Sequence, residues 1–143
     1  MAISQISVFV ENSRGKLAAI TELIAESGVD IRALSIGDSS DFGVLRMIVS
    51  DAPKAKAALE AGQHLVSITK VIAVEMPDVP GSMAKVIRDA SDAGVNIEYV
   101  YAFVAVSRRH AYLVIRAEDN SAAEQILLDK GYTLASEEEI AQL

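Results

Sequence analysis

Residues 76–97 read MPDVPGSMAKVIRDASDAGVNI, and this stretch contains the elements on which the fold prediction depends. A strand that starts from Val71 ends in a turn, and Gly81 in that turn directly precedes a helix. Gly94 closes the helix, because glycine is the usual residue after a helix end. Val95 then starts another strand. The stretch therefore predicts a strand, a turn, a helix and a strand in direct succession.

The same pattern occurs 66 positions earlier, over residues 10–31 (VENSRGKLAAITELIAESGVDI). Gly15 and Gly28 lie 66 residues before Gly81 and Gly94. Further matches at this offset are Ile6 with Ile72, Val8 with Val74, Ala18 with Ala84, Val29 with Val95 and Ile31 with Ile97. An internal repeat of this length predicts two similar structural units. We expect them to span residues 1–69 and 70–143, with a short C-terminal helical tail on the second.

Each unit is expected to have the order βαββαβ. In the first unit, strands are predicted over residues 3–10, 30–36, 44–49 and 65–68, with helices after Gly15 and from Asp51 to about Gly62. The second unit repeats this order, with strands from Val95 and Ala111, a helix from Ser121 and a last strand near Thr133. The compact solution is the α+β, ferredoxin-like arrangement, a four-stranded antiparallel sheet with both helices on one face. We expect the two units to form a continuous antiparallel sheet with helices on one face.

The composition excludes several classes of protein. The 143 residues (15.2 kDa) are 51% hydrophobic, which excludes a disordered chain. Disulfides and thiolate metal sites are excluded because the sequence has no cysteine. The net charge of −7 and the scattered Lys and Arg argue against nucleic-acid binding. No apolar run approaches the length of a membrane span, and no signal peptide is visible, so a cytoplasmic protein is expected.

Two short motifs, each present twice, resemble the signatures of the ACT domain, a small-molecule-sensing module of amino-acid metabolism. The first signature, an acidic or amide residue followed by Pro-Gly and an apolar residue, appears as DVPGSM at 78–83. The second appears as GVNI at 94–97. The first unit carries looser versions, NSRGKL at 12–17 with Arg14 in place of proline, and GVDI at 28–31 with Asp30 in place of asparagine. The resemblance covers essentially the whole chain as two ACT-like units.

The resemblance implies that an L-amino acid binds at an interface of two ACT-like units. The ligand carboxylate is expected on the helix-start amides near Gly81 or Gly15, since a helix N-terminus favours an anion. Asn96, Asp78 or their counterparts would accept hydrogen bonds from the ligand ammonium. The candidate ligand-binding residues are Asn12, Arg14, Gly15, Lys16, Leu17, Asp30 and Ile31 in the first unit, and Asp78, Val79, Pro80, Gly81, Ser82, Met83, Asn96 and Ile97 in the second.

Simpler interpretations exist for these residues. Gly15 and Gly81 are also typical of turns, and Asn12 or Asp78 would serve equally as helix caps. Tyr99, Tyr101 and Phe103 share one face of a strand, where they either pack in the core or a subunit contact or line a pocket for an apolar ligand side chain. Ser136 and Glu139 match a capping box, which indicates a short C-terminal helix.

The sequence favours a non-catalytic regulatory protein. His64 and His110 lie far apart and outside any metal-ligand spacing, and no phosphate-binding glycine loop is present, so no enzyme activity, metal or cofactor is expected. Residues 44–49 are apolar on both faces apart from Arg46, which predicts a homodimer that covers the helix-free sheet face. We therefore expect an amino-acid sensor with a possible partner enzyme of amino-acid or related metabolism. The alternative is a ligand-free interaction or assembly module.

Overall fold

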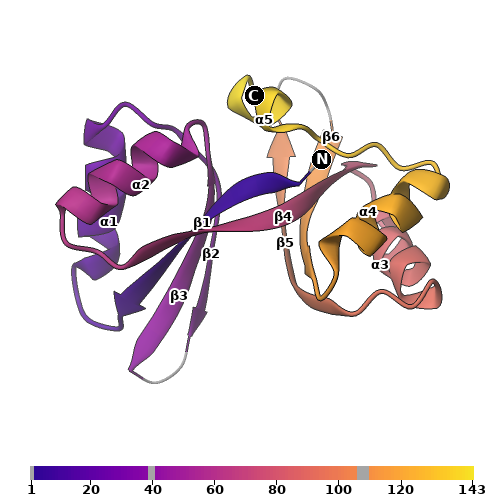
Figure 1. The fold of residues 1–143 in the computed structure, drawn as a ribbon, viewed down its shortest axis with the longest axis horizontal. Helices are drawn as coiled ribbons and strands as arrows, with labels where there is room; N and C mark the ends of the chain where they lie inside the picture. The colour runs from indigo at the N-terminus through magenta and orange to yellow at the C-terminus, as the bar shows by residue number, and fades with distance from the viewer. Residues whose placement is uncertain (1, 39–40, 106–109) are drawn as a thin grey trace. The chain divides into compact units, whose positions relative to one another are not determined.

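The computed structural model describes residues 2–38, 41–105 and 110–143. The sequence also predicts a turn at residues 38–41 and contains the adjacent basic pair Arg108-Arg109; the turn lies partly, and the pair wholly, outside the described residues. The elements are β1 (Ile3–Glu11), α1 (Lys16–Glu26), β2 (Ile31–Asp38), β3 (Phe42–Val49), α2 (Ala52–Ala61), β4 (Val66–Pro77), α3 (Ser82–Asp92), β5 (Ile97–Ala105), β6 (His110–Ala117), α4 (Asn120–Asp129) and α5 (Glu137–Ala141) (Figure 1).

The chain divides into two compact units, which we call the N-terminal unit (Ser4–Thr69) and the C-terminal unit (Lys70–Ala141). The predicted ferredoxin-like βαββαβ order of antiparallel strands is confirmed. Within the N-terminal unit the strands hydrogen-bond in the order β2-β3-β1, and within the C-terminal unit in the order β4-β6-β5. Residues 65–68 and the strand from Val71 were expected as two strands, whereas the structure joins them in the single strand β4.

The N-terminal unit has its core between the sheet and the helices α1 and α2. Ile6 on β1 lies opposite Met47 on β3, and Val8 lies opposite Leu45, with all four side chains fully buried. Because side chains alternate across a strand, these residues share one face. Ile20 and Ile24 of α1, together with Ala55 and Leu59 of α2, pack against that face.

The C-terminal unit repeats this arrangement with different residues. Ile72 on β4 pairs with Ile115 on β6, and Val74 pairs with Leu113. Val86 of α3 and Leu127 of α4 complete the cluster. The last predicted strand, near Thr133, is reduced to one bridge between Val74 and Leu134.

The C-terminal helix α5 starts as the capping-box pattern predicts. The Ser136 amide donates to the Glu139 carboxylate at 2.8 Å, and the Glu139 amide donates to Ser136 Oγ at 3.2 Å. This reciprocal pair satisfies two amides that a helix start otherwise leaves unpaired.

The aromatic residues of β5 lie on the helix-free face of the C-terminal unit. Tyr101 pairs with Val114, and Phe103 pairs with Tyr112. Val114 and Tyr112 alternate along β6 with the residues that face the core, so these pairs lie on the opposite face of the sheet. The Phe103 and Tyr112 rings stack with centroids 5.2 Å apart, and Tyr112 is fully buried. This contact favours packing over pocket lining for Phe103.

Candidate functional site

The turn between β1 and α1 brings the first group of candidate residues together. Gly15 is the N-cap of α1, with φ of 86° in the left-handed region that favours glycine. The Lys16 amide donates to the Ser13 carbonyl at 3.3 Å. No described side chain caps this helix, and a Cβ added at Gly15 would have nothing within 4 Å. The start of α1 is therefore open to a ligand.

The turn between β4 and α3 has the same geometry. Gly81 is the N-cap of α3 with φ of 90°, and the Ser82 amide donates to the Val79 carbonyl at 3.3 Å. The space above Gly81 is open as well. The interpretation of Asp78 as a helix cap is wrong, because α3 has no side-chain cap among the described residues.

The remaining turn residues lie at the surface. Val79 and Met83 are 58% and 39% exposed, and Leu17 is 38% exposed. Lys16 Nζ lies 3.9 Å from the Glu11 carboxylate on the same turn. Arg14 and Pro80 are also exposed, and Ser82 is half-buried.

A hollow of about 180 Å³ adjoins the N-terminal turn. It is lined by Val10, Glu11, Asn12, Ser13, Leu17, Ile36 and Gly43. Ile36 and Gly43 were not among the sequence candidates. Gly43 in a strand was the available signal, because a strand glycine often marks close backbone approach or space beside a sheet.

The second signature lies at the other end of each unit. The Asp30 amide donates to Ser50 Oγ at 2.9 Å, and the Asp30 carboxylate pairs with Arg32 at 2.5 Å. Asn96 Nδ2 donates to the Glu118 carboxylate at 3.1 Å. Ile31 and Ile97 follow as the first residues of β2 and β5.

The strand register shows that one unit cannot bring both signatures to one ligand. Ile97 pairs with Ala117 at one end of β5, whereas Ala105 pairs with His110 at the other. His110 in turn pairs with Pro77, next to the Asp78 turn. Eight residues of strand separate these ends by roughly 26 Å. Within a single unit, a molecule the size of an amino acid is therefore too short to span from the glycine turn to Asn96.

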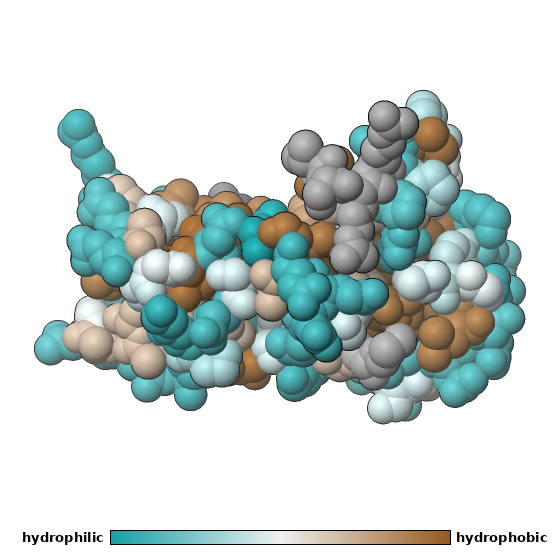
Figure 2. Space-filling model, turned by 90° about the horizontal axis from the view of Figure 1, so that it is seen from above, coloured by the Kyte–Doolittle hydropathy of each residue, from teal (hydrophilic) through white to brown (hydrophobic). Residues whose placement is uncertain are grey.

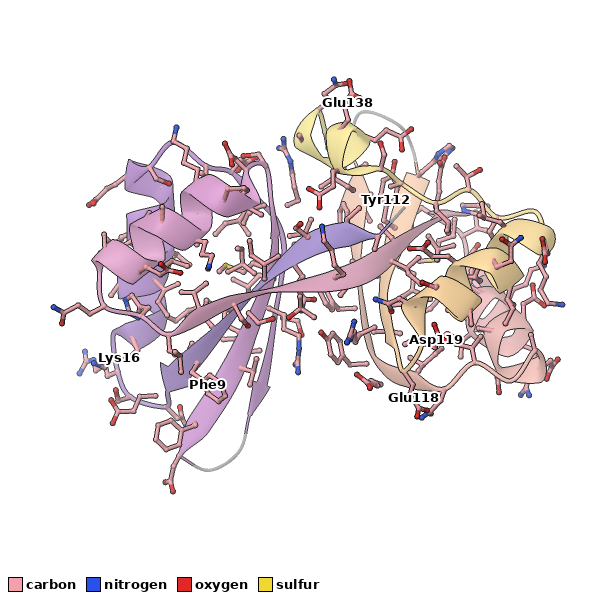
Figure 3. The ribbon with its side chains drawn as sticks, viewed as in Figure 1. Phe9, Lys16, Tyr112, Glu118, Asp119 and Glu138 are labelled. Atoms are coloured by element: carbon pink, nitrogen blue, oxygen red, sulfur yellow. The ribbon has the colours of Figure 1, made fainter. Side chains whose placement is uncertain are left out.

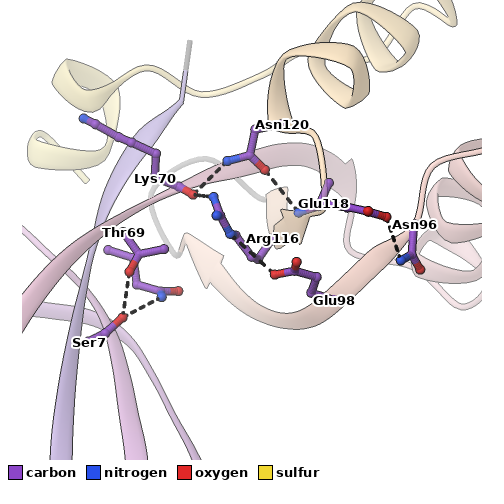
Figure 4. A network of polar contacts seen from close by, with 10 residues as sticks. Ser7, Thr69, Lys70, Asn96, Glu98, Arg116, Glu118 and Asn120 are labelled. Carbon is purple, nitrogen blue, oxygen red and sulfur yellow. Dashed lines mark hydrogen bonds and ion pairs between the residues drawn. The ribbon is translucent and has the colours of Figure 1, made fainter.

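A larger hollow, of about 540 Å³, lies beside Asn96 in the C-terminal unit. Glu118, Asp119 and Asn120 line it where β6 passes to α4 (Figure 3). Asn120 Nδ2 and Arg116 Nη1 both donate to the Lys70 carbonyl, at 2.8 and 2.9 Å, and Arg116 Nε lies 3.6 Å from Glu98 (Figure 4). The polar groups at this end are thus paired with one another.

Comparison with protein families gives one decisive match, since the model of the ACT domain pair matches residues 1–143. The chain belongs to the ACT domain pair family. No curated protein matches its sequence.

Solved structures share this fold. Protein BT0572 from Bacteroides thetaiotaomicron is 38% identical with a TM-score of 0.91, over 100% of the ACT pair and 98% of that chain. The ligand-free regulatory subunit of aspartate kinase from Thermus thermophilus is 21% identical with a TM-score of 0.63, over 90% and 92% of the two chains. The corresponding subunit from Thermus flavus is 22% identical with a TM-score of 0.60, over 88% and 90%.

A polar cluster ties α3 of the ACT pair to the segment after α4. Lys85 Nζ lies 2.9 Å from Asp89 and 3.0 Å from the Tyr132 hydroxyl, which donates to Asp89 at 2.5 Å. The hydrogen bonds to Asp89 and Tyr132 raise the pKa of Lys85. Those from Tyr132 and Lys85 lower the pKa of Asp89, while burial and the bond to Asp89 raise the pKa of Tyr132.

The described residues of the ACT pair form no metal-binding cluster and no membrane-spanning helix. Within residues 2–38, 41–105 and 110–143, no three His, Cys, Asp or Glu side chains gather in a group able to hold a metal ion. His110 instead contacts the Glu75 carboxylate. None of the described helices is long and apolar enough to cross a lipid bilayer.

Proposed function

We propose that this ACT pair is a non-catalytic regulatory protein that binds an L-amino acid and thereby changes its association with a partner enzyme of amino-acid or related metabolism. The observation that carries the proposal is the pair of open, uncapped helix starts at Gly15 and Gly81. Amides at a helix start favour a carboxylate, and a left-handed glycine leaves them accessible. Membership of the ACT family supports the same assignment.

We further propose that a complete site needs two ACT-like units. The glycine turn and the Asp30 or Asn96 signature lie at opposite ends of each unit. A ligand carboxylate on one turn and a ligand ammonium at Asp30 or Asn96 therefore require two units, which is consistent with binding at an interface.

A thermal-shift screen over the amino acids tests the proposal. A ligand that binds only the folded protein adds about 2.7 kcal/mol of stability at a hundredfold excess over its Kd. Absence of a shift with every amino acid would contradict the sensor and favour the ligand-free assembly module.

Two matched variants, Gly15→Asn and Gly81→Asn, locate the ligand by calorimetry. Both glycines have positive φ, which asparagine tolerates and valine does not. Each variant places a side chain over one helix start. We expect one of them to weaken binding at least tenfold while both keep a cooperative unfolding transition; unchanged affinity in both would place the ligand elsewhere.

The helix-free face of the N-terminal unit is our proposed dimer surface. Phe9 pairs with Val44 on the face opposite the core, and the Phe9 amide donates to the Leu65 carbonyl. Phe9 and Leu65 are 58% and 69% exposed, beside a hollow of about 250 Å³. Figure 3 labels Phe9 on β1, and Figure 2 shows apolar residues among hydrophilic ones on the surface seen from above. A second copy is the occupant that we propose for this apolar face.

A further inference from the structure

The hollow beside the N-terminal turn has apolar walls and a floor without a side chain. Val10 pairs with Gly43 on the face that carries the core, so a side chain at position 43 would project to the same side as Val10. A Cβ there would lie 3.3 Å from Cγ2 of Ile36 and 3.2 Å from the Gly37 carbonyl. Gly43 therefore lets Ile36 and Leu17 form walls around a space that a larger residue would occupy.

The volume indicates which side chains the hollow can hold. The hollow measures about 180 Å³. An engineered apolar cavity of about 150 Å³ holds benzene, a ring of six carbon atoms. A side chain of three or four carbon atoms is therefore small enough to fit inside this hollow.

The charges around the hollow argue against an ionised side chain. Glu11 is the one charged residue among the described residues that line it, and Lys16 lies 3.9 Å from that carboxylate. A second carboxylate would be repelled by Glu11 and desolvated by Val10, Leu17 and Ile36. Burying an ammonium against three aliphatic walls is unfavourable for the same reason.

The C-terminal unit has different residues at the equivalent positions. Met76 pairs with Ala111 where Val10 pairs with Gly43, and Ala102 pairs with Leu113 where Ile36 pairs with Leu45. In the C-terminal unit, Ala111 thus adds a Cβ at the position of Gly43. Ala102, at the position of Ile36, has a side chain three carbon atoms smaller. The described residues of the C-terminal unit therefore differ at the floor and at one wall of the hollow, although this unit carries the closer match to the first ACT signature, with Pro80.

We infer that the hollow selects an α-amino acid with a branched aliphatic side chain, bound at the N-terminal turn with its side chain between Leu17 and Ile36. This inference rests on the proposed function and adds to it the chemical class of the ligand and the unit that selects it.

Calorimetry with L-leucine, L-isoleucine, L-valine, glycine, L-aspartate and L-lysine tests the selectivity. We expect the three branched amino acids to bind at least tenfold more tightly than the others, because one methylene group in an apolar pocket changes affinity by about tenfold or more. Equal or tighter binding of aspartate or lysine would overturn the inference and leave the proposed function standing. No binding by any amino acid would overturn both.

The matched variants Leu17→Phe and Met83→Phe test the location. Both positions are second in their helices and 38–39% exposed, so the larger ring is accommodated at the surface. Leu17→Phe should fill the hollow and weaken leucine binding at least tenfold, with glycine binding unchanged, while Met83→Phe should change neither.

The opposite outcomes contradict the location. Loss of leucine binding in Met83→Phe alone would place the ligand in the C-terminal unit. A changed sedimentation coefficient in Leu17→Phe with unchanged affinity would show that the hollow is a subunit contact. Thermal unfolding of both variants verifies that they fold.

Discussion

The N-cap residues of this ACT pair are of two types, aspartate at α2 and α4 and glycine at α1 and α3. The Asp51 carboxylate accepts from the Lys54 amide, and the Asp119 carboxylate accepts from the Ala122 amide, both at 3.1 Å. Gly15 and Gly81 cap their helices without a side chain. Stabilising caps thus occur at α2 and α4, whereas α1 and α3 keep accessible amides.

This difference predicts the effect of removing an aspartate. Asp51→Ala should lower the free energy of unfolding by about 1 kcal/mol, because it removes a helix cap. Asp78→Ala is the control and should leave stability unchanged, since Asp78 does not cap α3. Urea denaturation measures both, and equal losses would show that Asp78 has a structural role after all.

The Lys85–Asp89–Tyr132 cluster predicts a pH dependence. The lowered pKa of Asp89 means that its stabilisation is present above the unfolded pKa of about 3.8 and is lost as the pH falls through the folded value. The raised pKa values of Lys85 and Tyr132 mean that their stabilisation is complete below the unfolded values, about 10, and is lost at higher pH.

Tyr132→Phe should therefore lower the Tm at neutral pH, and its difference from the wild type should shrink toward acid and alkaline pH, where the wild type loses the same stabilisation. Thermal unfolding from pH 3 to 11 measures this. A Tm difference between the variant and the wild type that stays constant across the range would contradict it.

At the scale of elements, the sequence predicted most helices and strands because their signals are local. The apolar stripe of α1 and the glycines that bound it lie within one short stretch, and Asp51 with Pro53 marks the start of α2. The hollow was missed because Leu17, Ile36 and Gly43 come together only through strand register. The separation of the two signatures within a unit was missed for the same reason.

Adjacent residues of α4 predict how burial affects stability. Leu127 is fully buried, while Leu128 is 42% exposed. Leu127→Ala should lower the free energy of unfolding by about 2–5 kcal/mol, because it leaves a cavity in the core. Leu128→Ala should change it by less than about 1 kcal/mol. Chemical denaturation of the two variants gives the comparison, and similar losses would contradict the assignment of the core face.

At the scale of the whole molecule, the proposed dimer predicts a sedimenting species of twice 15.2 kDa at micromolar concentration. Leu65→Asp should shift it toward the monomer, because a carboxylate on the apolar face is unfavourable to bury. Leu128→Asp, on the exposed side of α4, is the control and should stay dimeric. A monomer in the wild type would rule the dimer out.

Strand β4 also determines how the chain can be divided into separately expressed fragments. Its twelve residues extend from the N-terminal unit into the C-terminal unit, and Ile3 groups with the C-terminal unit. A cut between residues 69 and 70 would split a strand and leave each half with unpaired backbone amides and carbonyls. A gene fragment for either half would need to carry all of residues 66–77, so the strand would have to be duplicated rather than divided.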